Sequence, residues 1–98
     1  MNLLNLAKNE EKIYFALNNP IRSWIIELLK SYNALNSSDL ANLLHISLSR
    51  CCYHLDNLND LVKQDNEQRY YLSKQGIEAY QLLVEPEKSI DNIVKIMK

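Results

Sequence analysis

Hydrophobic residues recur at spacings of three and four along the first third of the chain, which is the signature of amphipathic helices. One such stripe predicts a helix over residues 2–18. Asn19 followed by Pro20 predicts the cap and first position of a second helix that ends near Lys30. We expect its buried face to consist of Ile21, Trp24, Ile25, Leu28 and Leu29.

The middle of the chain predicts two short helices that meet across about three residues. Residues 31–36 read as a linker or a two-residue edge strand, and Asn36 or Ser37 caps the first short helix, which ends near His45. Ser47 caps the next one. We expect the first to bury Leu40, Ala41, Leu43 and Leu44, and the second to bury Cys51, Leu55 and Leu58.

The pattern then changes from helical to β-compatible. Residues 61–64 and 69–72 are two short β-type runs separated by the polar loop 65–68, which predicts a hairpin. Ser73 caps a following helix that must stop before Pro86. We expect that helix to bury Ile77, Tyr80, Leu83 and Val84, and a final short helix to bury Ile90, Ile93, Val94 and Met97.

Composition indicates one soluble globular domain. The 98 residues allow a single core, and the contents of 47% hydrophobic and 23% charged residues are ordinary. One glycine and two prolines are too few for a loop-rich all-β fold. No apolar run reaches the length of a transmembrane helix, and the start does not resemble a signal peptide, so we expect a cytoplasmic protein without a membrane partner.

Several kinds of chemistry are disfavoured. The chain lacks a plausible Ser-His-Asp, Cys-His or paired-carboxylate arrangement, and its single glycine cannot make a phosphate-binding loop, so we expect no enzyme and no catalytic residues. Two histidines supply too few ligands for zinc, and we expect no metal or cofactor. Cys51 and Cys52 are adjacent, which disfavours an internal disulfide.

The predicted order of elements indicates a fold class. Two helices across a tight turn, followed by a hairpin, form a winged helix-turn-helix, in which the second helix enters the major groove of DNA. We therefore expect a mainly α domain over residues 1–98, with a helix-turn-helix at 37–60, a wing at 61–72 and extra helices at both ends. The net charge of −1 and isoelectric point near 6.1 provide no overall attraction to nucleic acid, so any attraction must be local.

Three segments carry a resemblance to a known family. They are residues 16–22 (Ala-Leu-Asn-Asn-Pro-Ile-Arg), residues 37–58 with the pair His54-Leu55, and the wing segment made of Leu61-Val62 and the run from Arg69-Tyr70-Tyr71-Leu72 to Gly76. Together, residues 16–85 resemble the ArsR-like and MarR-like winged helix-turn-helix regulators of bacteria, archaea and archaeal viruses. The resemblance implies a transcriptional regulator that binds double-stranded DNA without enzymatic activity.

The chain also departs from this family. His45 stands where the turn often has glycine, and Asp60 stands at a similar position after the recognition helix; both residue types tolerate a left-handed backbone. The cysteine-rich signature of the family's arsenic sensors is missing, so the resemblance implies no metal-responsive regulation and no ligand.

The expected DNA surface combines two elements. The N-terminal half of the recognition helix has no acidic residue and presents Ser47, Ser49, Arg50, Cys52 and Tyr53. The wing region adds Lys63, Arg69 and Lys74 for phosphate contacts, although Asp65 and Glu67 weaken it.

The individual side chains leave alternatives open. Arg50 either pairs with guanine or holds a phosphate or a surface carboxylate, and Tyr53 either contacts DNA or covers the flank of its helix. We expect Cys51 to be buried, and Cys52 to lie at the edge of the DNA-facing surface, either inert or open to oxidation. His54 is expected to be structural.

The terminal segments suggest self-association. Apolar stripes in residues 1–18 and 87–98 predict a homodimer interface, and the alternative is packing of the two segments on each other in a monomer. The expected interface residues are Leu3, Leu6, Ile13, Ile90, Ile93, Val94 and Met97. A homodimeric DNA-binding regulator is thus the preferred function, and a protein–protein interaction module of the same fold is the alternative.

Overall fold

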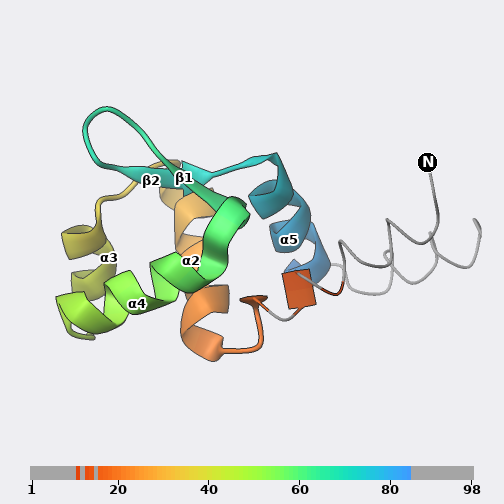
Figure 1. Ribbon diagram of the computed structural model, residues 1–98, viewed down its shortest axis with the longest axis horizontal. Coiled ribbons are helices and arrows are strands. Elements are labelled where there is room, and N and C mark those ends of the chain that lie inside the picture. Colours follow the sequence, from red (N-terminus) through yellow and green to blue (C-terminus); the bar gives the residue numbers. More distant parts are fainter. Residues whose placement is uncertain (1–10, 12, 15, 85–98) are drawn as a thin grey trace, which may run out of the picture.

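The chain is mainly helical and carries one small antiparallel hairpin, as the sequence predicts (Figure 1). A computed structural model describes residues 11, 13, 14 and 16–84. The elements are α2 (Pro20–Tyr32), α3 (Ser37–Leu44), α4 (Leu48–Leu58), a single 3-10 turn η1 (Asn59–Leu61), β1 (Val62–Gln64), β2 (Tyr70–Leu72) and α5 (Lys74–Val84). Glu11, Ile13, Tyr14 and Ala16 are helical. The expected helix at 90–97 and most of the one at 2–18 lie outside the described residues.

Side-chain caps set the starts of α2, α3 and α4. The side chain of Asn19 accepts a hydrogen bond from the Ile21 N–H (2.8 Å), and Pro20 follows at the first helical position, which confirms the predicted start of α2. Asn36, rather than Ser37, caps α3 by accepting from the Asp39 N–H at 2.7 Å. Ser47 caps α4 as predicted, because its hydroxyl accepts from the Arg50 N–H at 3.1 Å.

The turn between α3 and α4 depends on a left-handed residue. His45 has φ 56° and ψ 43°, as expected for a residue in the position that often belongs to glycine. After α4, the positive φ (49°) falls on Asn59, so the expectation for Asp60 is wrong by one position.

The hairpin strands are shorter than predicted, and Leu35 forms an additional β-bridge to β2. Leu61 belongs to η1 and Arg69 to the loop, so each strand has only three residues. The register pairs Val62 with Leu72 and Gln64 with Tyr70. On the other side of β2, Leu35 and Tyr70 exchange two backbone hydrogen bonds, 3.0 and 2.7 Å, so residues 31–36 do contain an edge β-bridge.

Helix α5 is tied directly to η1, the turn that follows α4. The hydroxyl of Ser73 accepts from the Gly76 N–H (3.1 Å), which confirms the predicted cap, and donates to the Asp60 carbonyl in η1. A Cβ atom on Gly76 would overlap the Leu61 carbonyl oxygen. The absence of a side chain therefore lets α5 approach the backbone of η1 closely.

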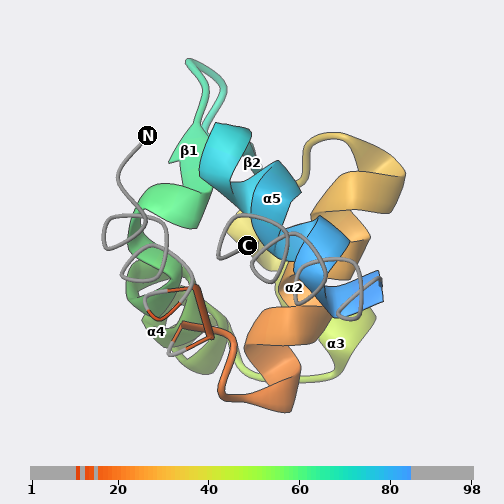
Figure 2. The same cartoon turned by 90° about the vertical axis from the view of Figure 1, so that its right-hand side faces the viewer.

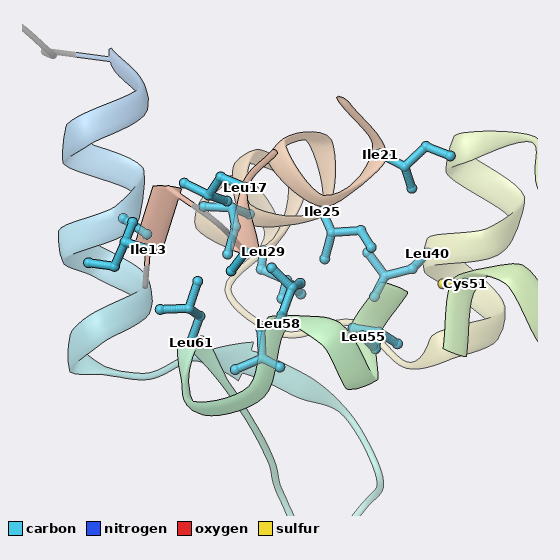
Figure 3. Packing of buried hydrophobic residues seen from close by; sticks show 14 of the residues in the cluster. Ile13, Leu17, Ile21, Ile25, Leu29, Leu40, Cys51, Leu55, Leu58 and Leu61 are labelled. Carbon is cyan, nitrogen blue, oxygen red and sulfur yellow. The ribbon is translucent and has the colours of Figure 1, made fainter. Parts of the chain in front are cut away.

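The hydrophobic core formed by the described residues lies around α2, which packs against α3, α4, α5 and β2 (Figure 3). Because α2 has neighbours on several sides, Ile26 is fully buried although its position lies outside the predicted face. Cys51, Leu55 and Leu58 are buried as predicted.

Four predicted core residues are instead exposed. The predicted burial of Trp24, Leu43, Ile77 and Val84 is wrong, since these side chains are between 44% and 51% exposed. Each lies on the flank of an apolar stripe, and a short helix in a small domain has neighbours around only part of its circumference. The described part of the chain contains no helix with the length and apolar character needed to span a bilayer.

Candidate functional site

The candidate site is built on α3, the turn at His45, α4 and the hairpin. Helices α3 and α4 pack against each other and against α2, and Figure 2 shows the hairpin projecting away from the helices. The N–H of Ile46 donates to the Ala41 carbonyl (3.1 Å), which closes the turn onto α3. The start of α4 is therefore held by backbone hydrogen bonds on one side and by the Ser47 cap on the other.

One face of α4 is free. Ser49, Arg50 and Tyr53 are exposed, and Tyr53, at 59%, is the most exposed of the large hydrophobic side chains described. The Tyr53 side chain is therefore accessible to a ligand at this face. Ser47 is exposed at the cap and Cys52 is half-buried at the edge of this face. The structure thus brings together all five residues predicted on this helix.

The opposite face of α4 is anchored in the core. Burial, with a smaller contribution from neighbouring Cys52, raises the pKa of Cys51 to about 11, so this thiol stays protonated at neutral pH. Cys51 therefore behaves as a buried hydrophobic residue, as expected.

His54 is also part of this anchor. Its ring is 4% exposed and packs edge-to-face on Tyr53, with ring centroids 5.2 Å apart. Burial first, and then the charges of Arg22 and Arg50, lower the pKa of His54 below its usual value. A neutral, buried His54 agrees with the predicted structural role.

Tyr70 on β2 is packed against the hydrophobic core, and β2 itself packs on α2. Burial is the main cause that raises the pKa of the Tyr70 hydroxyl, and the charges of Cys52, Asp56 and Cys51 on α4 add to it, so the hydroxyl is neutral.

The basic residues of the hairpin region have unequal environments. Lys63 on β1 and Lys74 at the start of α5 are exposed. Arg69 is instead paired with two carboxylates, because its Nε donates to Asp65 Oδ2 at 3.0 Å and its Nη2 lies 3.3 Å from Glu67 Oε2. Sequence reasoning anticipated that these acids weaken the basic wing, but not that they bind Arg69.

Asp65 also organises the hairpin loop. Its Oδ1 accepts hydrogen bonds from the backbone N–H groups of Arg69 and Glu67, both at 2.9 Å. The first of these is the main reason that the pKa of Asp65 is lowered, and the Glu67 N–H and the Arg69 guanidinium add to it. Asp65 is therefore an ionised carboxylate that closes the loop.

Sequence reasoning missed one exposed residue at this site. Leu48, at the first turn of α4, is 51% exposed although it lies seven residues before buried Leu55 on the same stripe. The first turn of a helix projects beyond its packing partners, and periodicity alone does not reveal where those partners end.

Metal ligands do not gather among residues 11, 13, 14 and 16–84, where no group of three His, Cys, Asp or Glu side chains is placed to hold an ion.

Comparisons with known proteins identify a shared fold. No family model matches the chain, and no curated protein matches it either. The structure is similar to the crystal structure of RV1404 from Mycobacterium tuberculosis, with a TM-score of 0.59. The two proteins are 21% identical, and the match covers 96% of this chain and 70% of that one. A similarity at this level of identity concerns the fold.

Proposed function

We propose that this protein is a winged helix-turn-helix regulator that binds double-stranded DNA in a sequence-specific manner as a homodimer. The observation that carries the proposal is the free face of α4, on which Ser49, Arg50 and Tyr53 are exposed next to a buried, well-anchored face. Its N-terminal half contains no carboxylate, so it does not repel phosphates when the helix enters a major groove. In this proposal α3 and α4 are the helix-turn-helix and β1–β2 is the wing.

Arg50 is the proposed base-reading residue. Its side chain is exposed in the first turn of α4, and the planar guanidinium matches the O6 and N7 acceptors of guanine. Tyr53, one turn further along, offers a ring to a sugar or a thymine methyl group. Ser47, Ser49 and Cys52 complete the helix contacts, while Lys63, Arg69 and Lys74 hold phosphates on either side of the groove.

Exposed apolar residues support self-association. Ile77 and Val84 lie seven residues apart on α5, and therefore on the same face, with exposures of 44% and 48%. Ile13 is instead buried in the core of the single chain beside α5, which leaves it no free surface for a partner (Figure 3). The other six residues of the predicted interface, Leu3, Leu6, Ile90, Ile93, Val94 and Met97, lie outside the described residues. Sedimentation at tens of micromolar tests the dimer, and a monomer there contradicts it.

The decisive experiment is selection of bound fragments from a random duplex pool. A two-fold dimer is expected to recover an inverted repeat whose half-sites are about one helical turn apart. Failure to enrich any sequence contradicts specific recognition.

Arg50 provides the matched test on the recovered site. Arg50→Ala is expected to cost about 1–3 kcal/mol on that site and much less on random DNA. Arg50→Lys is the control, because it retains the charge and removes the planar fork. We expect the lysine variant to keep the salt dependence of binding and to lose discrimination. If both variants discriminate like the wild type, Arg50 does not read a base.

One observation favours a protein-interaction module as the second candidate. From His45 to Lys74 four basic residues balance four acidic ones, and Arg69 is already paired with carboxylates. A salt titration separates the two candidates, because binding to DNA weakens steeply and linearly on a logarithmic salt scale.

A further inference from the structure

The loop of the hairpin contains a charge cluster that the proposed function does not explain. Arg69 lies between Asp65 and Glu67, and the three side chains together carry a net charge of −1 at the tip of the hairpin. A hairpin that contacts phosphates is expected to carry positive charge at this place.

The two carboxylates play different parts. Asp65 is fixed by the two backbone N–H groups that it accepts, and it holds the Arg69 Nε at 3.0 Å. Glu67 makes only the 3.3 Å contact with Arg69 Nη2, and its side chain is 74% exposed. Asp65 is therefore part of the loop structure, whereas Glu67 is free to leave.

The position of Glu67 matters because of the geometry of the guanidinium. An arginine grips a phosphate with two parallel N–H groups, either through its end, with Nη1 and Nη2, or through its side, with Nε and Nη2. Because Asp65 holds Nε, the end-on grip through Nη1 and Nη2 is the one left for a phosphate. The carboxylate of Glu67 lies 3.3 Å from Nη2, so it places a negative charge beside the oxygen of an incoming phosphate and competes with that phosphate for the guanidinium.

We propose that Glu67 is an autoinhibitory carboxylate that occupies Arg69 in the free protein and is exchanged for a DNA phosphate on binding. Asp65 remains bound to Nε during the exchange and keeps the guanidinium at the loop. The inference rests on the proposed DNA-binding function. In this arrangement the Glu67 carboxylate competes with DNA phosphates for Arg69, and it therefore lowers the affinity of the protein for both specific and random DNA.

The test is a double-mutant cycle measured on one DNA duplex at low salt. Glu67→Gln is expected to tighten binding about two- to fivefold, the range typical of an exposed ion pair. In an Arg69→Gln background, Glu67→Gln is expected to change the DNA affinity no more than a control substitution does. The control is Glu27→Gln, which removes the same charge from the exposed face of α2. All variants leave Asp65, and thus the loop, intact.

The possible outcomes separate the two proposals. An equal gain from Glu67→Gln with and without Arg69 shows simple repulsion of DNA and overturns the exchange. If the Glu67→Gln variant binds DNA with the same affinity as the wild type, the exchange is overturned as well. If no variant binds any duplex at low salt, the DNA-binding function itself is wrong, and the exchange falls with it.

Discussion

Replacing Gly76 with alanine tests the junction between α5 and η1. Gly76 lies inside the first turns of α5, where helix propensity alone predicts that alanine stabilises the protein by up to about 1 kcal/mol. The structure predicts the opposite sign. The added Cβ overlaps the carbonyl oxygen of Leu61 and also comes within 3.2 Å of the Leu72 Cβ.

The size of the effect follows from what the new methyl group meets. The obstacle is backbone, which cannot rotate away as a flexible side chain does, so α5 and η1 must separate. Overpacking of this kind costs about 1–3 kcal/mol, which exceeds the gain in helix propensity. Because the obstacle is backbone, we place the cost at the upper end of this range, and after the propensity gain is subtracted we expect Gly76→Ala to lower the free energy of unfolding by about 2 kcal/mol. The separation also strains the hydrogen bond from the Ser73 N–H to the Leu61 carbonyl, 3.0 Å long.

Urea denaturation followed by circular dichroism measures this change. Gln75→Ala is the matched control, since Gln75 is the exposed preceding residue of the same helix and the substitution probes propensity without the contact. A Gly76→Ala variant that is as stable as this control, or more stable than the wild type, refutes the close approach of α5 to η1.

Three further predictions follow from the capping and titrating groups. Burial and two nearby arginines lower the pKa of His54 below 6.5, so the contribution of the neutral ring to the free energy of unfolding is fully present above pH 6.5 and is lost as the pH falls through the lowered pKa. Denaturation measured between pH 7.5 and 5 is expected to show this loss in the wild type and in His45→Asn, and not in His54→Gln. A thiol reagent is expected to label half-buried Cys52 in the native protein and to spare Cys51, and the reverse order contradicts the assigned faces of α4. Asn36→Ala is expected to cost about 1 kcal/mol through loss of the α3 cap, and no change in the denaturation midpoint contradicts it.

The start and end signals of the helices were predictable from single residues. Asn19 with Pro20, Ser47 and Ser73 act through local hydrogen bonds, and His45 takes a backbone conformation open to few residue types. Such signals depend only on neighbours in the chain, so the sequence contains all the information that they need.

Burial was less predictable because it depends on distant partners. Trp24 and Ile26 both lie on α2, and only the arrangement of the surrounding elements decides that the first is exposed and the second buried. On α4, where one side alone meets neighbours, the predicted stripe was correct.

The candidate site was predicted as a set of positions, without its internal contacts. The sequence placed Arg69 beside acidic residues, but the ion pairs arise from the path of the loop, in which Gln68 takes a positive φ of 64° and its N–H donates to the Asp65 carbonyl at 3.1 Å. This conformation of the loop turns Asp65 and Arg69 toward each other, and the spacing of hydrophobic residues in the sequence does not predict it.

The bridge between Leu35 and Tyr70 has a consequence for local opening of the molecule. It joins the chain just before α3 to the strand that follows α4, so both helices lie within a loop closed at its base by two backbone hydrogen bonds. Neither helix can detach from the domain by fraying from a free end. The helix pair and β2 are therefore expected to open as one cooperative unit, with slow and similar hydrogen exchange at the amides of Leu35 and Tyr70.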